Sequence, residues 1–206
     1  DGDYMMIVFG GAFNPPTIAH LNIIKKLLST YKGSHVLLLP VGNDYSKSEL
    51  IDINHRIKML QLMIDQIDCA SVSEIEANRK YQGTLASLNE LSKIDKDIHF
   101  VIGLDNLLGI KRWIKYQELL EKYPFIVMDR KGSVTKEEAD RAFADLKHDF
   151  TFVDFDEDIS STLVREDKEN REKLLTKEIS NYIIKNHGNH FYKFDSKREF
   201  INTRRK

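Results

Sequence analysis

The chain alternates short apolar runs with helical patterns, and this alternation is the feature that most limits its fold. Apolar residues recur at helical spacing over Leu21–Leu28, Ile57–Ile67 and Leu85–Leu91. Between these patterns lie five runs with little polar alternation: Met6–Phe9, His35–Leu39, His99–Ile102, Phe125–Met128 and Phe150–Phe155. Such runs are typical of strands that are covered on both faces. The pattern therefore predicts an α/β domain with a mainly parallel sheet, whose ligand crevice lies at the carboxyl ends of the strands.

The stretch GGAFNPPTIAH, Gly10–His20, follows the first apolar run directly. It predicts a tight turn at the two glycines and a helix beginning near Thr17, so that backbone N–H groups and a helix N-terminus meet and favour an anion. Thr17 and His20 share one helix face at this spacing, and imidazole can donate to a phosphate oxygen. The alternative is a plain turn in which Thr17 only caps the helix and His20 packs in the core.

A second candidate phosphate site is DISSTLVRED, Asp158–Asp167, which follows the last apolar run. Consecutive hydroxyl residues at a helix start offer a cap and free amides, and Arg165 lies three residues after Thr162 on the same face. Hydroxyls, amides and a guanidinium together suit a phosphate group. The alternative is an ordinary cap beside a surface arginine. The first stretch, GGAFNPPTIAH, matches neither the Walker nor the GxGxxG pattern.

Composition restricts the partners and the compartment. With 31 basic and 32 acidic residues and a net charge of −1, the chain has no global field for nucleic acid or for an anionic membrane, and we expect neither as a partner. Cys69 is the only cysteine, which excludes an internal disulfide, and we expect it to be a small buried thiol. The lack of a membrane-spanning run or a leader pattern, together with the single cysteine, predicts a cytoplasmic protein. Whether translation starts at Met5 or Met6 stays open.

The remaining histidines show no metal-ligand spacing, so no metal site of the protein's own is expected. No linker divides the chain. We expect one domain over residues 5–186, followed by a polar C-terminal extension over residues 187–206. The oligomeric state stays open, a homo-oligomer included.

GGAFNPPTIAH and ISSTLVR resemble the (H/T)xxH and ISSTxxR motifs of the nucleotidylyltransferases of Rossmann-like fold, which join a nucleotide to a phosphorylated acceptor and release pyrophosphate. More narrowly, the chain resembles the nicotinate mononucleotide adenylyltransferases of NAD biosynthesis. Three further segments in family order carry the narrower resemblance: LPVGNDYSKSELIDINHRIKMLQLMI, YQGTLASL and VIGLDNLLGIKRWIKYQELL. The resemblance implies a Rossmann-like, doubly wound sheet of about five to six strands in a single domain with a helical C-terminal part.

The resemblance also implies substrates and site residues. ATP, carrying Mg²⁺ with it, and nicotinate mononucleotide would be the substrates, and His20 and Arg165 would be the catalytic residues. Further ATP-binding residues would be Gly11, Ala12, Phe13, Thr17, Gly103, Asp105, Ser161 and Thr162, and the mononucleotide-binding residues would be Lys47, Thr84 and Trp113. The chain departs from the family pattern at Thr17, often histidine, at Ala19, usually glycine, and at Lys80–Gln82 before Thr84, where a tyrosine-threonine pair is common.

Other functions stay open at this point. A pantetheine-phosphate adenylyltransferase shares TxxH and ISSTxxR, and a cytidylyltransferase would use CTP in place of ATP. A nucleotide-sensing module would keep the fold without turnover. The choice between nicotinate and nicotinamide mononucleotide also depends on the altered Lys80–Gln82 segment.

Overall fold

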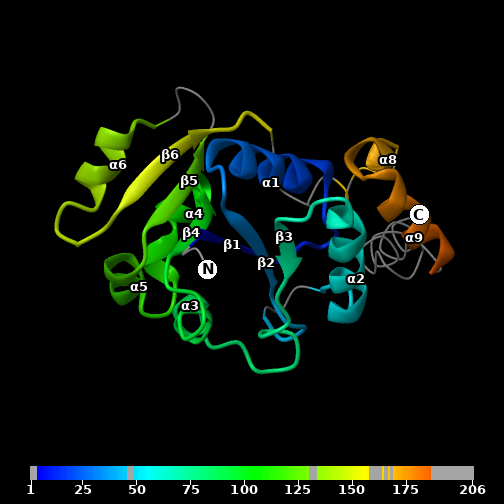
Figure 1. Cartoon of the computed structure of the whole chain (residues 1–206), viewed down its shortest axis with the longest axis horizontal. Coiled ribbons are helices and arrows are strands. Elements are labelled where there is room, and N and C mark those ends of the chain that lie inside the picture. The colour runs from blue at the N-terminus through cyan, green and yellow to red at the C-terminus, as the bar shows by residue number, and fades with distance from the viewer. Residues whose placement is uncertain are drawn as a thin grey trace, which may run out of the picture.

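The computed structural model describes residues 4–45, 49–129, 134–157, 164, 167 and 169–186. These residues form a six-stranded sheet in the order β3-β2-β1-β4-β5-β6, and all of its neighbouring strands run parallel (Figure 1). The strands are β1 (Met6–Gly11), β2 (His35–Pro40), β3 (Ala70–Val72), β4 (Ile98–Gly103), β5 (Phe125–Asp129) and β6 (Phe150–Asp154). The predicted parallel, doubly wound α/β sheet is therefore confirmed.

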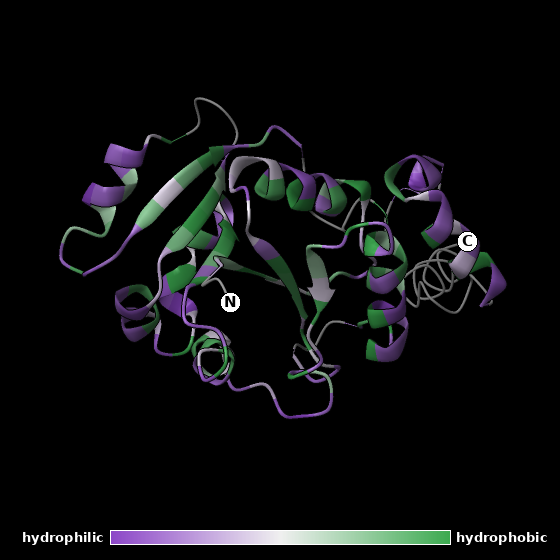
Figure 2. Ribbon diagram, viewed as in Figure 1, coloured by the Kyte–Doolittle hydropathy of each residue, from purple (hydrophilic) through white to green (hydrophobic). Residues whose placement is uncertain are grey.

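Helices cover both faces of the sheet (Figure 1). One core cluster joins α1 (Ile18–Thr30), α2 (Ile53–Ile64) and α9 (Lys177–Lys185) to one face of the sheet. The other cluster joins α3 (Thr84–Leu91), α4 (Leu104–Leu108), α5 (Tyr116–Lys122) and α6 (Lys136–Ala142) to the opposite face. The short η1 (Ile110–Arg112) and α8 (Arg171–Leu174) complete the described helices. Hydrophobic residues are concentrated in the central strands, while the helices carry both hydrophobic and hydrophilic residues (Figure 2).

Three local expectations were wrong. β3 was not predicted, because Ala70–Val72 is only three residues long and carries little apolar signal. The second helix ends at Ile64, so Ile67 lies outside it, in the turn that leads toward β3. Gly10 and Gly11 belong to β1 itself, because their backbone continues the pairing with β2 as far as Pro40, and the turn begins only after them.

The order of the strands places the ligand crevice. From β1 the chain moves to β2 and β3 on one side and then crosses back to β4 on the other side of β1, so the topology reverses between β1 and β4. Pairing between these two strands is recorded from Met6 and Ile98 to Phe9 and Val101, whereas β1 stays paired with β2 up to Gly11. In open parallel sheets, ligands bind at such a reversal point, beyond the carboxyl ends of the strands.

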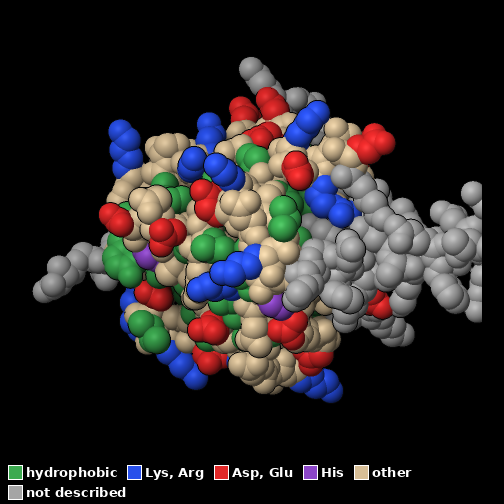
Figure 3. All heavy atoms as spheres, turned by 90° about the vertical axis from the view of Figure 1, so that its right-hand side faces the viewer, with side chains coloured by type: hydrophobic (Ala, Val, Ile, Leu, Met, Phe, Trp, Pro, Cys, Tyr) green, Lys and Arg blue, Asp and Glu red, His purple; other side chains and the backbone are tan. Residues whose placement is uncertain are grey.

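On the side of the molecule that holds α2, α8 and α9, the described residues form no large surface patch of one charge sign (Figure 3). Basic and acidic side chains are interspersed among the described residues there (Figure 3). Cys69 is exposed just before β3, so the expectation of a buried thiol was wrong. Within the described part of the chain, no helix is both long and apolar enough to cross a membrane.

Candidate active site

The loop from β1 to α1 ends in a reciprocal cap formed by Thr17 and His20. The backbone N–H of Thr17 donates to Nδ1 of His20 at 2.9 Å, and the backbone N–H of His20 donates to the Thr17 hydroxyl oxygen at 3.4 Å. The hydroxyl oxygen also lies 3.1 Å from Nδ1. The predicted helix start at Thr17 is confirmed, and the cap commits the Thr17 side chain to His20.

This cap fixes the chemical state of the His20 ring. Because Nδ1 accepts a hydrogen bond, the proton of the neutral ring sits on Nε2. His20 is only 7% exposed, and burial lowers the pKa of its imidazole to about 4. At neutral pH the side chain is therefore an uncharged ring with one fixed donor, Nε2–H.

Phe13 supports the ring from the loop. Its ring packs edge-on against His20, with centroids 5.0 Å apart, and against Phe9 at 5.3 Å. Phe13 has a φ of 48°, a left-handed conformation that bulky residues rarely adopt, and the side chain is almost fully buried. Strained backbone of this kind persists only where its surroundings hold it, and it gathers at binding sites.

Asn14 and Arg56 hold the same loop from the side of β2. The Asn14 side chain accepts from the backbone N–H of Ile51 at 2.7 Å and donates to the carbonyl oxygen of Glu49 at 3.3 Å. Arg56 donates to the carbonyl oxygen of Ala12 at 3.0 Å. Our sequence analysis missed Arg56, because a charged residue on an amphipathic helix is expected at the surface. The one sequence feature that could have revealed its burial is that Arg56 lies on the apolar face of α2.

Gly103 and Asp105 lie across the reversal point from this loop. Gly103 ends β4 and is the N-cap of α4, where no side chain caps the helix. Asp105 is exposed in the first turn of α4, a position that favours a carboxylate. The structure thus places both predicted adenosine-side residues at the carboxyl end of the strand that neighbours β1.

The predicted pyridine-side residues come from two neighbouring elements. Thr84 begins α3, whose N-cap Gly83 offers no side chain to the first amides of the helix. Gly83 has a φ of 95°, and a Cβ there would lie 3.0 Å from Cβ of Ile114, so this close approach requires glycine. Trp113 follows η1 and is partly buried, with its ring edge-on to Phe100 at 6.1 Å. Trp113 thus lies one residue from Ile114, which touches the start of α3.

The altered segment before Thr84 adds one tyrosine, Tyr81, to this side. The Tyr81 ring packs edge-on against Tyr45, with centroids 4.8 Å apart, and its hydroxyl group is hydrogen-bonded to Thr84. Burial raises the pKa of Tyr81, while the bond to Thr84 opposes this rise. Beside them, Glu76 is buried, and burial raises its pKa to about 7 against the opposing effects of Ser87 and Arg79.

The segment after β6 approaches α1. The Asn22 side-chain amide lies 2.9 Å from each carboxylate oxygen of Glu157, the residue before the DISST motif. Asn22 is on α1, two residues after His20, so this contact brings Glu157 to the helix of the first motif. Ser161, Thr162, Arg165 and Lys47 lie outside the described residues. Within the described ranges, no group of three His, Cys, Asp or Glu side chains could hold a metal ion.

Comparison with known proteins agrees with this geometry. Residues 8–167 match the family described as cytidylyltransferase-like. The chain is 37% identical over 183 residues to a protein of Acholeplasma laidlawii named "Probable nicotinate-nucleotide adenylyltransferase", with 88% of this chain and 96% of that protein covered. A protein of the same name from Caldicellulosiruptor bescii is 32% identical over 163 residues, which cover 77% and 83% of the two chains.

The fold has solved counterparts. The Plasmodium falciparum nicotinic acid mononucleotide adenylyltransferase complexed with NaAD superposes with a TM-score of 0.74 at 18% identity, covering 88% of this chain and 95% of that one. The same enzyme complexed with APC gives a TM-score of 0.71. At this identity the superposition establishes the fold, and the sequence relatives establish the family. The chain belongs to the cytidylyltransferase-like family and, within it, to the nicotinate-nucleotide adenylyltransferases.

Proposed function

We propose that this chain transfers the adenylyl group of ATP to the phosphate of nicotinate mononucleotide, forming nicotinate adenine dinucleotide and pyrophosphate. The observation that carries the proposal is the His20 ring, held neutral with Nε2–H as its one donor in the loop that follows β1. This loop lies at the reversal point of the sheet, where nucleotides bind in such folds. The substrates are inferred from the family relationship.

The chemistry needs no protein base. A mononucleotide phosphate, with a second pKa near 6, is already an anionic nucleophile at neutral pH. One of its oxygens attacks the α-phosphorus of ATP, the new P–O bond forms, and the bond to the β-phosphate oxygen breaks with its electron pair leaving on pyrophosphate. Catalysis then consists of holding two anions in line and stabilising the charge on the leaving group.

His20 suits this task because a neutral donor supplies a hydrogen bond without the cost of burying a charge. We assign Gly11, Ala12 and Phe13 to backbone contacts with the nucleotides, and Gly103 and Asp105 to the adenosine. Ser161, Thr162 and Arg165 would grip the triphosphate, with Arg165 catalytic beside His20. ATP would enter as its magnesium complex, so that the metal belongs to the substrate.

The pyridine side supports nicotinate over nicotinamide. The first amides of α3 have no side-chain cap, and Thr84 lies at that end of the helix. A carboxylate can accept from such amides and is favoured by the helix N-terminus, whereas the NH₂ group of nicotinamide would face donors. We assign Thr84 and Trp113 to the pyridine ring and Lys47 to the mononucleotide phosphate. We also propose a cytoplasmic location, where the exposed Cys69 would stay reduced.

The test is pyrophosphate release with a panel of substrates. With ATP, we expect kcat/KM for nicotinate mononucleotide to exceed that for nicotinamide mononucleotide by at least about tenfold, or about 1.4 kcal/mol. Phosphopantetheine as acceptor and CTP as donor should give little turnover. Equal kcat/KM for the two mononucleotides would contradict the preference for nicotinate over nicotinamide. If phosphopantetheine or CTP is turned over in preference, the proposed function is wrong and the corresponding alternative holds. If no pair is turned over, the nucleotide-sensing module is the remaining alternative.

A further inference from the structure

Arg56 of α2 is the largest side chain that is completely buried among the described residues. Its guanidinium donates to three backbone carbonyl oxygens: Nη1 to Ala12 at 3.0 Å and to Val41 at 2.6 Å, and Nε to Ile51 at 2.6 Å. Nη2 donates to the side-chain oxygen of Asn43 at 3.2 Å. The buried guanidinium thus donates four hydrogen bonds to oxygen atoms of loop segments and none of these to a carboxylate.

These acceptors belong to three segments, one of which is the candidate-site loop after β1. Ala12 lies in the loop after β1, Val41 directly after β2, and Ile51 in the segment that leads into α2. Asn14 bonds to this last segment as well, through Ile51 and Glu49. Since a planar guanidinium offers its donors in a fixed fork, one side chain sets the spacing of all three segments.

The guanidinium keeps its charge in this environment. Burial lowers the pKa of Arg56 to about 10, while the nearby Asp52 carboxylate opposes the decrease. The group is therefore cationic at neutral pH. The ion pairs formed by described residues do not include Arg56. A charge with little solvent around it acts over a longer range than one at the surface.

The contact with Ala12 links this charge to the loop that we assign to ATP. A strong donor on the Ala12 carbonyl polarises the peptide that joins it to Phe13 and makes the N–H of Phe13 a better donor. The same bond supports the left-handed backbone of Phe13. An apolar side chain in place of Arg56 would fill the space but would leave three carbonyl oxygens without these donors.

We propose that Arg56 is a positioning residue for the adenylyl transfer: it holds the Ala12–Phe13 peptide in the shape that binds the ATP phosphates and adds a buried positive charge beneath them, without touching the substrate itself. The assignment of the loop to ATP rests on the proposed function. The geometry of Arg56 does not depend on which acceptor is used.

The test compares Arg56→Ala with wild type by calorimetric binding of a non-hydrolysable ATP analogue, which requires no turnover. We expect affinity to fall by about tenfold or more, and kcat/KM for ATP to fall further than that for the mononucleotide. Guanidinium ion at low millimolar concentration should fill the cavity and restore at least half of the lost binding energy. Urea has the same shape without the charge and should not restore it. Arg141→Ala, on the exposed α6, is the matched control and should bind like wild type.

Arg56→Lys carries the test if Arg56→Ala does not fold. It keeps the charge but has a single nitrogen in place of the planar fork, so it cannot meet the four spaced acceptors at once, and its affinity should fall between those of wild type and of a charge-free Arg56→Met. The proposal is overturned if Arg56→Ala binds the analogue as tightly as wild type does. It is also overturned if Arg56→Lys and Arg56→Met both bind it as tightly as wild type, or if urea and guanidinium restore binding equally. If wild type binds the analogue but does not adenylylate nicotinate mononucleotide, the proposed function fails while the role of Arg56 is still measured.

Discussion

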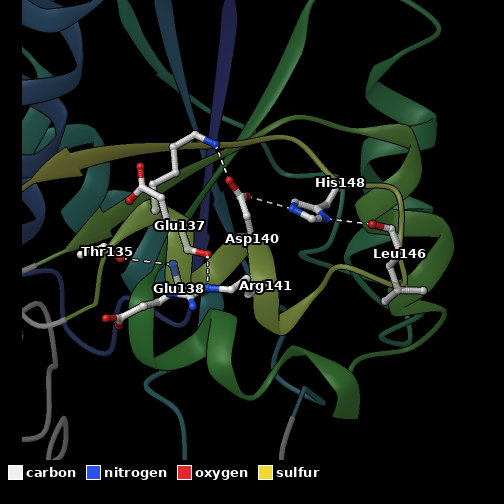
Figure 4. A network of polar contacts seen from close by, with 8 residues as sticks. Thr135, Glu137, Glu138, Asp140, Arg141, Leu146 and His148 are labelled. Carbon is white, nitrogen blue, oxygen red and sulfur yellow. Dashed lines mark hydrogen bonds and ion pairs between the residues drawn. The ribbon is translucent and has the colours of Figure 1, made fainter.

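The His20 network at the end of β1 and the His148 network beside α6 both place an imidazole among polar neighbours, yet the partners and their exposure differ. Nδ1 of His20 meets a donor, the Thr17 N–H, in a buried setting. His148 meets two acceptors: its ring nitrogens lie 2.8 Å from the Leu146 carbonyl oxygen and 2.9 Å from Asp140 Oδ1 (Figure 4). The ring of His20 thus faces a backbone donor, whereas the ring of His148 faces two oxygen atoms.

The surroundings explain what each network does. Around His20 there is little water, so a misplaced donor or charge costs much, and the state of the ring is fixed. Around His148 the partners are exposed: Asp140 is 36% exposed and Lys136, 2.7 Å away, 50%. Water competes for such contacts, and their net contribution is small. The comparison teaches that burial, and not the number of polar partners, fixes the role of each imidazole: the contact in the loop after β1 is buried, and the one beside α6 is partly exposed.

The largest expected effect, on kcat, comes from variants of His20 that keep the function of one ring nitrogen and lose that of the other. In His20→Asn the amide oxygen replaces Nδ1, so it still accepts from Thr17 but offers nothing at Nε2. In His20→Gln the amide reaches the place of Nε2. We expect His20→Asn to lower kcat by roughly a hundredfold or more with little loss of stability, as for one lost preorganised donor.

Steady-state kinetics, with urea unfolding as the control, make this measurement. His20→Gln should keep more of kcat than His20→Asn. If His20→Asn has the kcat of wild type, then Nε2 does not act on the transition state, and the residue is a core histidine with a capping role.

The pH dependence of stability gives the next largest effect. The pKa of His20 is about 4 in the folded chain and about 6.5 when unfolded, so the unfolded chain binds more protons between these values. The free energy of unfolding should therefore decrease as pH falls through this window, by on the order of 2 kcal/mol between pH 7 and pH 5 from His20 alone. Urea unfolding of wild type and of His20→Asn at both pH values isolates this contribution. Equal pH dependence in the two proteins would show that His20 is not buried as a neutral ring.

Breaking the surface network gives the smallest effect. The hydrogen bond from Lys136, and then that from His148, lowers the pKa of Asp140. Its contribution is thus present above the ordinary pKa of aspartate and is lost as pH falls through the lower folded value. Asp140→Asn should reduce the free energy of unfolding at pH 7 by less than about 1 kcal/mol and leave kcat unchanged. A loss of about 2 kcal/mol, as large as the contribution of His20 between pH 7 and pH 5, would contradict the contrast between the two networks.

The sequence predicted the parts of this chain whose signal is local. The five apolar runs form strands, and the helix predicted to begin near Thr17 begins at Ile18 with Thr17 as its N-cap. Thr17 and His20 were recognised as a pair from their spacing alone. The structure shows that they bond to each other, so that the capping and functional interpretations of Thr17 are not exclusive.

The rest depended on contacts between distant segments. β3 is a strand because it lies beside β2, which three residues of weak apolar character do not reveal. Arg56 is buried because carbonyl oxygens from three loops converge on it, and no window of sequence shows such convergence. The predicted roles of Gly103, Asp105, Thr84 and Trp113 agree with their places at the strand ends but stay predictions.

The pairing of β1 with β4 has a consequence for how the chain acquires activity. It joins Met6 to Ile98, whereas Met6 meets its other neighbour, His35, through a much shorter loop. Closing the longer loop costs more chain entropy and slows folding. A nucleotide that contacts both strand ends binds only after this closure, and its binding energy then adds to the stability of the closed form. Substrate saturation should therefore protect the central strands from unfolding and proteolysis, coupling the lifetime of the enzyme to the supply of its own nucleotides.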